Sequence, residues 1–149
     1  MLRFGHILRQ NSRTATSTKK FNRDSWRVLK SWMSLAESGD QKAVLDLYAK
    51  EASLIPTLWN MPRETSVQRA EYFEMFVPRI VGEVTPGYIR ETKIAEDTYL
   101  YFGILDFDLD IGKTGARKSF LIHKENNGDW KIMHHHSSQL PEVGKPYVL

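Results

Sequence analysis

Three strand-like runs in the last fifty residues constrain the fold more than any other feature of the chain. They cover residues 98–102, 116–123 and 130–138, and an Asn127-Gly128 pair separates the last two runs. Asn-Gly is the preferred pair of a two-residue hairpin turn. The sequence therefore predicts that the last two runs pair as antiparallel strands.

The last run carries three consecutive histidines, and the predicted pairing decides where they point. Side chains alternate between the two faces of a strand, so His134, His136 and Ser138 share one face and His135 lies on the other. If Asn126 faces Asp129, each pair of opposed residues lies on one side of the sheet. The inward face is then expected to gather a cationic, hydroxyl-rich cluster suited to a small anion: Arg117, Ser119, His134, His136 and Ser138.

The first half of the chain has helical spacing. Apolar residues at this spacing predict a helix over about 26–36, a short helix after Asp40 and a third helix that starts at Ser66 and ends near Pro78. Residues 52–58 predict an edge strand, because Pro56 cannot donate a ladder hydrogen bond. Four strands are expected near residues 88–95, 98–109, 116–125 and 130–138.

Helices followed by a strand-rich half predict an α+β fold. We expect a curved, cone-shaped antiparallel sheet packed on three N-terminal helices, with a cavity between the concave face and the third helix. The predicted organisation is a basic tail over 1–22, the α+β body over 23–142 and a C-terminal tail over 143–149.

Composition limits the function classes. The 149 residues suit one domain. The sequence contains no run of 18 apolar residues, so no membrane span is predicted. The absence of cysteine excludes thiolate metal sites and cysteine nucleophiles. The net charge of +3 divides into +6 over residues 1–23 and −3 over the rest. Since a nucleic-acid-binding body would carry clustered basic residues, no nucleic acid is expected as a partner.

The tail is rich in Arg, Ser and Thr and contains no acidic residue. This composition is typical of an organellar transit peptide, which predicts a mitochondrial or chloroplast location. The alternative is a disordered basic arm that stays on a cytoplasmic protein.

Several motifs together resemble a known family. They are Gly39-Asp40 between two helices, Leu-Tyr-Ala over 47–49, Leu-Ile-Pro-Thr-Leu-Trp-Asn over 54–60, Glu-Tyr-Phe over 71–73, and Trp-Lys-Ile-Met-His-His-His-Ser-Ser-Gln-Leu-Pro-Glu over 130–142. The pattern resembles the association domain of calmodulin-dependent kinase II in a stand-alone form, within the nuclear-transport-factor-2-like superfamily, and it covers about residues 24–142. The His-Ser-Ser ending and the Pro-Thr-Leu segment resemble the iota-class carbonic anhydrases.

The resemblance implies reversible hydration of carbon dioxide to bicarbonate and self-association through the sheet, with a dimer favoured. By motif, the catalytic residues would be Thr57, Tyr72, His136 and Ser138. Arg117, Ser119 and His134 would contact the substrate. Lys118-Ser119 departs from the relatives, which tend to have an aromatic residue and a threonine there.

The sequence leaves open whether the protein binds a metal and whether it is an enzyme. Some iota-class enzymes are described with zinc or manganese and others without metal; here His134 and His136 are the available ligand pair, and a catalytic zinc needs a third. The main alternative to an enzyme is a non-catalytic oligomerisation or assembly module. A third possibility is isomerisation or hydrolysis in the same cone.

Overall fold

The structure is a computed structural model that describes residues 20–141. Its elements follow the predicted order: α1 (Arg23–Glu37), α2 (Gln41–Asp46), β1 (Tyr48–Ile55), α3 (Ser66–Phe76), the 3-10 turn η1 (Val77–Arg79), β2 (Ile80–Ala95), β3 (Thr98–Leu109), β4 (Gly112–Lys124) and β5 (Trp130–Gln139). β2 begins earlier than predicted. Most of the predicted transit peptide and the predicted 143–149 tail lie outside the described residues.

Side-chain caps set the starts of the three helices. The Asn22 side chain accepts hydrogen bonds from the backbone N–H groups of Asp24 and Ser25, so α1 starts before the expected Asp24-Ser25 cap. Asp40 caps α2 in the same way. Thr65 and Gln68 form a reciprocal capping box on α3. Among residues 20–141, no helix is both long and apolar enough to cross a bilayer.

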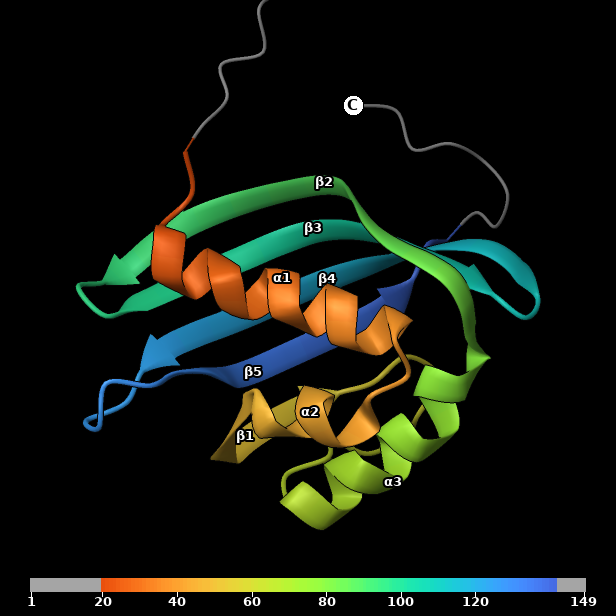
Figure 1. The fold of residues 1–149 in the computed structure, drawn as a ribbon, viewed down its shortest axis with the longest axis horizontal. Coiled ribbons are helices and arrows are strands. Elements are labelled where there is room, and N and C mark those ends of the chain that lie inside the picture. Colours follow the sequence, from red (N-terminus) through yellow and green to blue (C-terminus); the bar gives the residue numbers. More distant parts are fainter. Residues whose placement is uncertain (1–19, 142–149) are drawn as a thin grey trace, which may run out of the picture.

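The five strands form one curved sheet in the order β1-β5-β4-β3-β2. Its neighbours are antiparallel except β1, which pairs with β5 in parallel and forms the predicted edge. α1 lies across one face of the sheet, while α2 and α3 gather beyond its β1 edge (Figure 1). The predicted α+β cone is confirmed.

Gly103 allows β2 to bend closely over β3. A Cβ added at Gly103 would lie 1.8 Å from the carbonyl oxygen of Tyr88 on β2. The pairing register of β2 with β3 shifts beside this contact, between Pro86 and Tyr88. Only glycine permits so close a backbone approach, so this residue contributes to the curvature that forms the cone.

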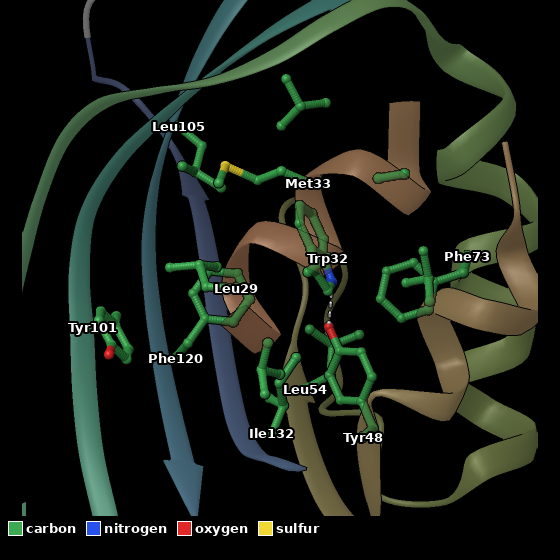
Figure 2. Packing of buried hydrophobic residues seen from close by; sticks show 14 of the residues in the cluster. Leu29, Trp32, Met33, Tyr48, Leu54, Phe73, Tyr101, Leu105, Phe120 and Ile132 are labelled. Atoms are coloured by element: carbon green, nitrogen blue, oxygen red, sulfur yellow. Dashed lines mark hydrogen bonds between the residues drawn. The ribbon is translucent and has the colours of Figure 1, made fainter. Parts of the chain in front are cut away.

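Trp32 lies at the centre of the core between α1, α3 and the sheet. Its side chain is fully buried, with the rings of Phe120 and Phe73 at 5.5 and 6.5 Å between centroids. Its indole N–H donates a hydrogen bond to the hydroxyl of Tyr48 at 2.9 Å, drawn as a dashed line in Figure 2. The concave face of the sheet is therefore filled at this level.

The β4–β5 hairpin differs from the predicted two-residue turn. Glu125 donates its backbone N–H to the carbonyl of Asp129 at 2.8 Å, which closes a three-residue loop, 126–128, with Gly128 at φ 91°. The register then shifts between Leu121 and Ile122, because Met133 is an extra residue on β5. Beyond this bulge, Ser119 faces His136 and Arg117 faces Ser138, as predicted.

The bulge at Met133 changes which side of the sheet the histidines occupy. Ile132 before it and His135 after it are both fully buried on the concave face. His134 and His136 therefore point to the convex face, which the helices leave uncovered. The predicted cluster shares one face, but its placement inside the cone is wrong.

Candidate functional site

A cavity of about 170 Å³ lies at the open end of the cone. It is bounded by the loop after β1, by α3 and η1, and by the adjacent ends of β3, β4 and β5. Its walls are largely apolar, with a few polar groups on one side. The residues that bear on its chemistry are Thr57, Trp59, Tyr72, Phe76, Arg79, Phe107, Lys118 and Ser137.

The loop that follows β1 is held in place by Arg63. The backbone of Arg63 exchanges two hydrogen bonds with Leu54, and its guanidinium lies 3.9 Å from the ring centre of Trp59. The chain reverses at Leu58, whose φ of 60° is unusual for a residue with a side chain. These contacts hold Trp59 and Thr57 at the cavity wall.

Two hydroxyl groups meet at this wall. Thr57 Oγ1 and Ser137 Oγ are hydrogen-bonded at 2.7 Å, which joins the loop to β5. The Tyr72 hydroxyl adds a third, because this side chain is 3% exposed and has no hydrogen-bond partner within residues 20–141. Burial raises the pKa of Tyr72, so its hydroxyl keeps its proton at neutral pH. The cavity therefore offers hydrogen-bond donors to a ligand.

Lys118 places a buried amine beside these hydroxyls. Its side chain is 3% exposed, and no carboxylate within the described chain lies at ion-pair distance. Nζ lies 5.1 Å from the ring centre of Phe107 and 5.7 Å from that of Phe76, two cavity residues. Burial among aromatic rings lowers the pKa of Lys118 to about 7.

A hydrogen-bonded chain connects Lys118 to the core. Because the Trp32 indole can only donate, the Tyr48 hydroxyl accepts from it and is free to donate to Nδ1 of His135, 2.7 Å away. We assign the remaining proton of His135 to Nε2, which lies 3.4 Å from Lys118 Nζ and faces the amine lone pair.

This assignment requires both His135 and Lys118 to be neutral. Burial holds the pKa of His135 well below its usual value, so its ring is uncharged at neutral pH. Burial raises the pKa of Tyr48 well above its usual value. With its pKa lowered to about 7, Lys118 is uncharged in a large fraction of the molecules at neutral pH and in nearly all of them above about pH 8.

The structure separates the sequence-predicted site residues into two groups. Thr57 and Tyr72 line the cavity as expected. The other five lie on the convex face: Arg117, Ser119, His134, His136 and Ser138. There, Arg117 Nε donates to Ser138 Oγ at 3.1 Å, and His134 Nδ1 is hydrogen-bonded to Ser53 Oγ at 2.7 Å. His136 and Ser138 therefore do not share a pocket with Thr57 and Tyr72, because the bulge at Met133 reverses the face.

The predicted metal ligands do not form a metal site with the cavity. His134 and His136 point away from it, and residues 20–141 contain no group of three or more His, Asp or Glu placed to hold an ion. Inside the cone, both ring nitrogens of His135 face protein partners. The polar side chains that line the cavity are hydroxyls, one amine, one guanidinium and the amide of Gln139, with no imidazole or carboxylate, so they do not fit zinc or manganese.

Sequence reasoning missed three residues of the concave face: Lys118, His135 and Ser137. One signal was present. Positions 116, 118, 120 and 122 alternate inward on β4 as Ala, Lys, Phe and Ile, so a single lysine interrupts an otherwise apolar series. The bulge at Met133 gave no comparable signal.

The calcium/calmodulin dependent protein kinase II association domain family matches residues 21–141 of the chain. A solved structure from Xanthomonas campestris, provisionally described as such a domain, is 30% identical, with a TM-score of 0.75. The similarity covers 85% of this chain and 93% of that one. A search of curated proteins gives no match.

Two more distant structures have the same fold. A ketosteroid isomerase-like protein from Erwinia carotovora atroseptica is 13% identical with a TM-score of 0.69, over 82% of this chain and all of that one. An NTF-2 like protein of unknown function from Shewanella oneidensis MR-1 is 19% identical with a TM-score of 0.66, over 78% of this chain and 97% of that one. At these identities the similarity confirms the nuclear-transport-factor-2-like fold alone.

Proposed function

The chain belongs to the calcium/calmodulin-dependent protein kinase II association-domain family, and from this we propose that it is a self-associating domain. Its copies pair, as a dimer, through the convex face of the sheet. The observation that carries the proposal is the set of apolar residues exposed on that face. Helix α1 lies across the opposite face of the sheet (Figure 1).

The apolar residues on the convex face lie on three of the five strands, β1, β3 and β4. Phe102 on β3 and Ile55 on β1 are 37% and 38% exposed, and three half-buried residues complete the set: Leu100, Ile104 and Leu121. The register places Phe102 opposite Ser119, which faces His136, which in turn faces Ile55. Exposed apolar side chains beside polar ones, here Ser119 and His136, are typical of an interface between subunits.

Sedimentation velocity of the protein and of Phe102→Glu tests the association. We expect a dimer that becomes a monomer in the variant. In a twofold dimer both copies carry the new glutamate, so the interface would bury two charges without partners. Val67→Glu is the matched control, since Val67 is 67% exposed on α3, away from the sheet. A monomeric unmutated protein at micromolar concentration, or an assembly that Phe102→Glu leaves intact, would refute the proposal.

We also propose a second function, the hydration of carbon dioxide in the cavity. A specific observation favours it: the Thr57–Ser137 hydroxyl pair lies on the same concave wall as the amine of Lys118, which faces Ser137 across β4 and β5. A water held by the hydroxyls would attack the carbon of carbon dioxide while Lys118 accepts its proton. Tyr72 and Arg79 would hold the oxygens of the bicarbonate.

Stopped-flow measurement of carbon dioxide hydration, with and without a chelator, tests this second function. Ser137→Ala and Ser138→Ala distinguish the cavity from the motif-based assignment, because these neighbours point to opposite faces. We expect Ser137→Ala to lower the rate on the order of a hundredfold, the typical loss of one positioned group. No hydration by the unmutated protein, or a loss confined to Ser138→Ala, would exclude the cavity as the site.

A further inference from the structure

The amine of Lys118 is buried beside an apolar cavity, which suits chemistry beyond the proton acceptance proposed for hydration. Among residues 20–141, its one hydrogen-bonding neighbour is Nε2 of His135, and its remaining surroundings are aromatic rings. A lysine kept for charge would have a carboxylate partner or a path to water. This one lines a cavity instead, and its lone pair becomes available to a ligand when the 3.4 Å contact with His135 is given up.

We propose that Lys118 is the reacting amine of a site that captures a small apolar aldehyde or ketone as an imine. The proposal does not depend on self-association or on carbon dioxide hydration. Desolvated lysines beside apolar walls are the ones that react with carbonyl compounds, since only the neutral amine is a nucleophile.

The walls of the cavity indicate the chemical class of the ligand. The rings of Trp59, Phe76 and Phe107 suit a compact apolar body, and no acidic side chain lines the cavity. Its volume of about 170 Å³ compares with the roughly 150 Å³ cavity that accommodates benzene in another protein. A carbonyl compound of about the size of benzaldehyde therefore fits.

Hydroxyl groups in the cavity can supply the proton transfers. The Nζ lone pair attacks the carbonyl carbon, a C–N bond forms, and the carbonyl oxygen gains the proton that the nitrogen loses. Tyr72, whose hydroxyl has no hydrogen-bond partner within residues 20–141, can carry this proton, and so can the Ser137–Thr57 pair. The nitrogen then loses its second proton to the same oxygen, the C–O bond breaks, and water leaves as the C=N bond of the imine forms, so no oxidant or reductant is needed.

Reductive trapping with benzaldehyde tests the proposal on the full chain. The protein is incubated at pH 7 with limiting benzaldehyde and cyanoborohydride, which reduces the imine to a stable benzyl amine. Peptide mass mapping then measures the occupancy of every lysine. We expect occupancy of Lys118 at least tenfold above that of any other lysine, and loss of the dominant adduct in Lys118→Met.

Two comparisons make the test specific. Lys113→Met on the same strand removes a lysine whose side chain is 89% exposed, so the dominant adduct should remain. 1-Pyrenecarboxaldehyde is too large for the cavity, so it should label the exposed lysines and spare Lys118. Modification spread over the exposed lysines with Lys118 unlabelled by benzaldehyde would overturn the proposal, whether or not Lys118→Met folds.

Discussion

Lys118 Nζ lies 3.4 Å from Nε2 of His135 inside the core, so two basic side chains meet there with no carboxylate at ion-pair distance among residues 20–141. Burial favours the uncharged form of both side chains, because a buried charge without a partner is costly. This relationship links the fold to the cavity: the aromatic packing that stabilises the core also sets the protonation state of the amine. It also leads to predictions on stability.

Lys118→Met should stabilise the protein at neutral pH, and the gain should shrink as the pH rises. The unfolded chain keeps the lysine proton up to about pH 10.5, while the folded protein releases it near pH 7. Between these values the unfolded state binds more protons, so the stability of the unmutated protein rises with pH. The slope is on the order of 1.4 kcal/mol per pH unit for one proton.

Urea unfolding of both proteins between pH 7 and 10 measures this difference. The neighbouring groups His135, Tyr48 and Tyr72 stay uncharged across most of this range, because burial shifts the pKa of each away from it. The difference in the free energy of unfolding should therefore report Lys118 alone. A difference that does not change with pH would mean that Lys118 has an ordinary pKa.

His135→Ala should destabilise the protein far more than His136→Ala. His135 is fully buried, its ring is stacked on Phe120 with centroids 4.1 Å apart, and its Nδ1 accepts from Tyr48. Removing it leaves a void and an unpaired hydroxyl, at a cost of about 2–4 kcal/mol. His136 is exposed, so its loss should cost about 0.5 kcal/mol or less.

Denaturant titration at one protein concentration compares the two histidine variants. The contrast is sharp because the substitution is the same at adjacent positions. Equal losses of stability, or a larger loss from His136→Ala, would contradict the bulge at Met133 and restore the face predicted from simple alternation.

The register of β5 shows what could and could not be predicted from the sequence. Strand positions follow from periodicity. The pairing of His136 with Ser119 was also predicted correctly, because two differences from the predicted hairpin compensate. The wider loop at Gly128 shifts the pairing by one residue, and the bulge at Met133 shifts it back. They do not cancel in side-chain direction, since one extra residue reverses the face. Bulges depend on tertiary packing, so alternation alone placed His134 and His136 on the wrong side.

The cavity was predicted in part for a related reason. Thr57 and Tyr72 were found through short motifs, and those motifs do not depend on register. Lys118 and Ser137 were missed because their importance comes from burial, which local pattern does not reveal for a polar residue. The position of Lys118 between buried neighbours became informative only once the concave face of the sheet was known.

Gly103→Ala should be strongly destabilising. The new methyl group would start 1.8 Å from the carbonyl oxygen of Tyr88, so β2 would have to move away from β3. We expect a loss of about 3 kcal/mol or more, as for other severe steric conflicts in a packed core. Gly112→Ala is the control: Gly112 has φ 109° but open space around it, so only backbone strain of about 1–2 kcal/mol applies. Thermal unfolding that ranks these variants in the opposite order would disagree with the bend at Gly103.

Arg69→Lys should loosen the attachment of α3 to β1 even though it keeps the charge. The guanidinium of Arg69 is 2% exposed and donates to the carbonyl oxygens of Ala49 at 3.0 Å and Lys50 at 3.1 Å, as well as to those of Ala52 and Glu64. A lysine ammonium cannot span four acceptors in a fixed fork, so carbonyl groups are left unpaired in the interior.

The expected cost of Arg69→Lys is on the order of 2 kcal/mol, the value of one or two hydrogen bonds to a charged group. Hydrogen exchange provides the local measurement: amides of α3, including that of Tyr72, should exchange faster, while those of β3 and β4 should change little. Arg27→Lys is the matched control, because Arg27 is exposed and forms a surface ion pair with Asp24, at 3.6 Å. If both variants left the exchange of α3 unchanged, the buried guanidinium would not be what holds this helix, and with it Tyr72, against the cavity.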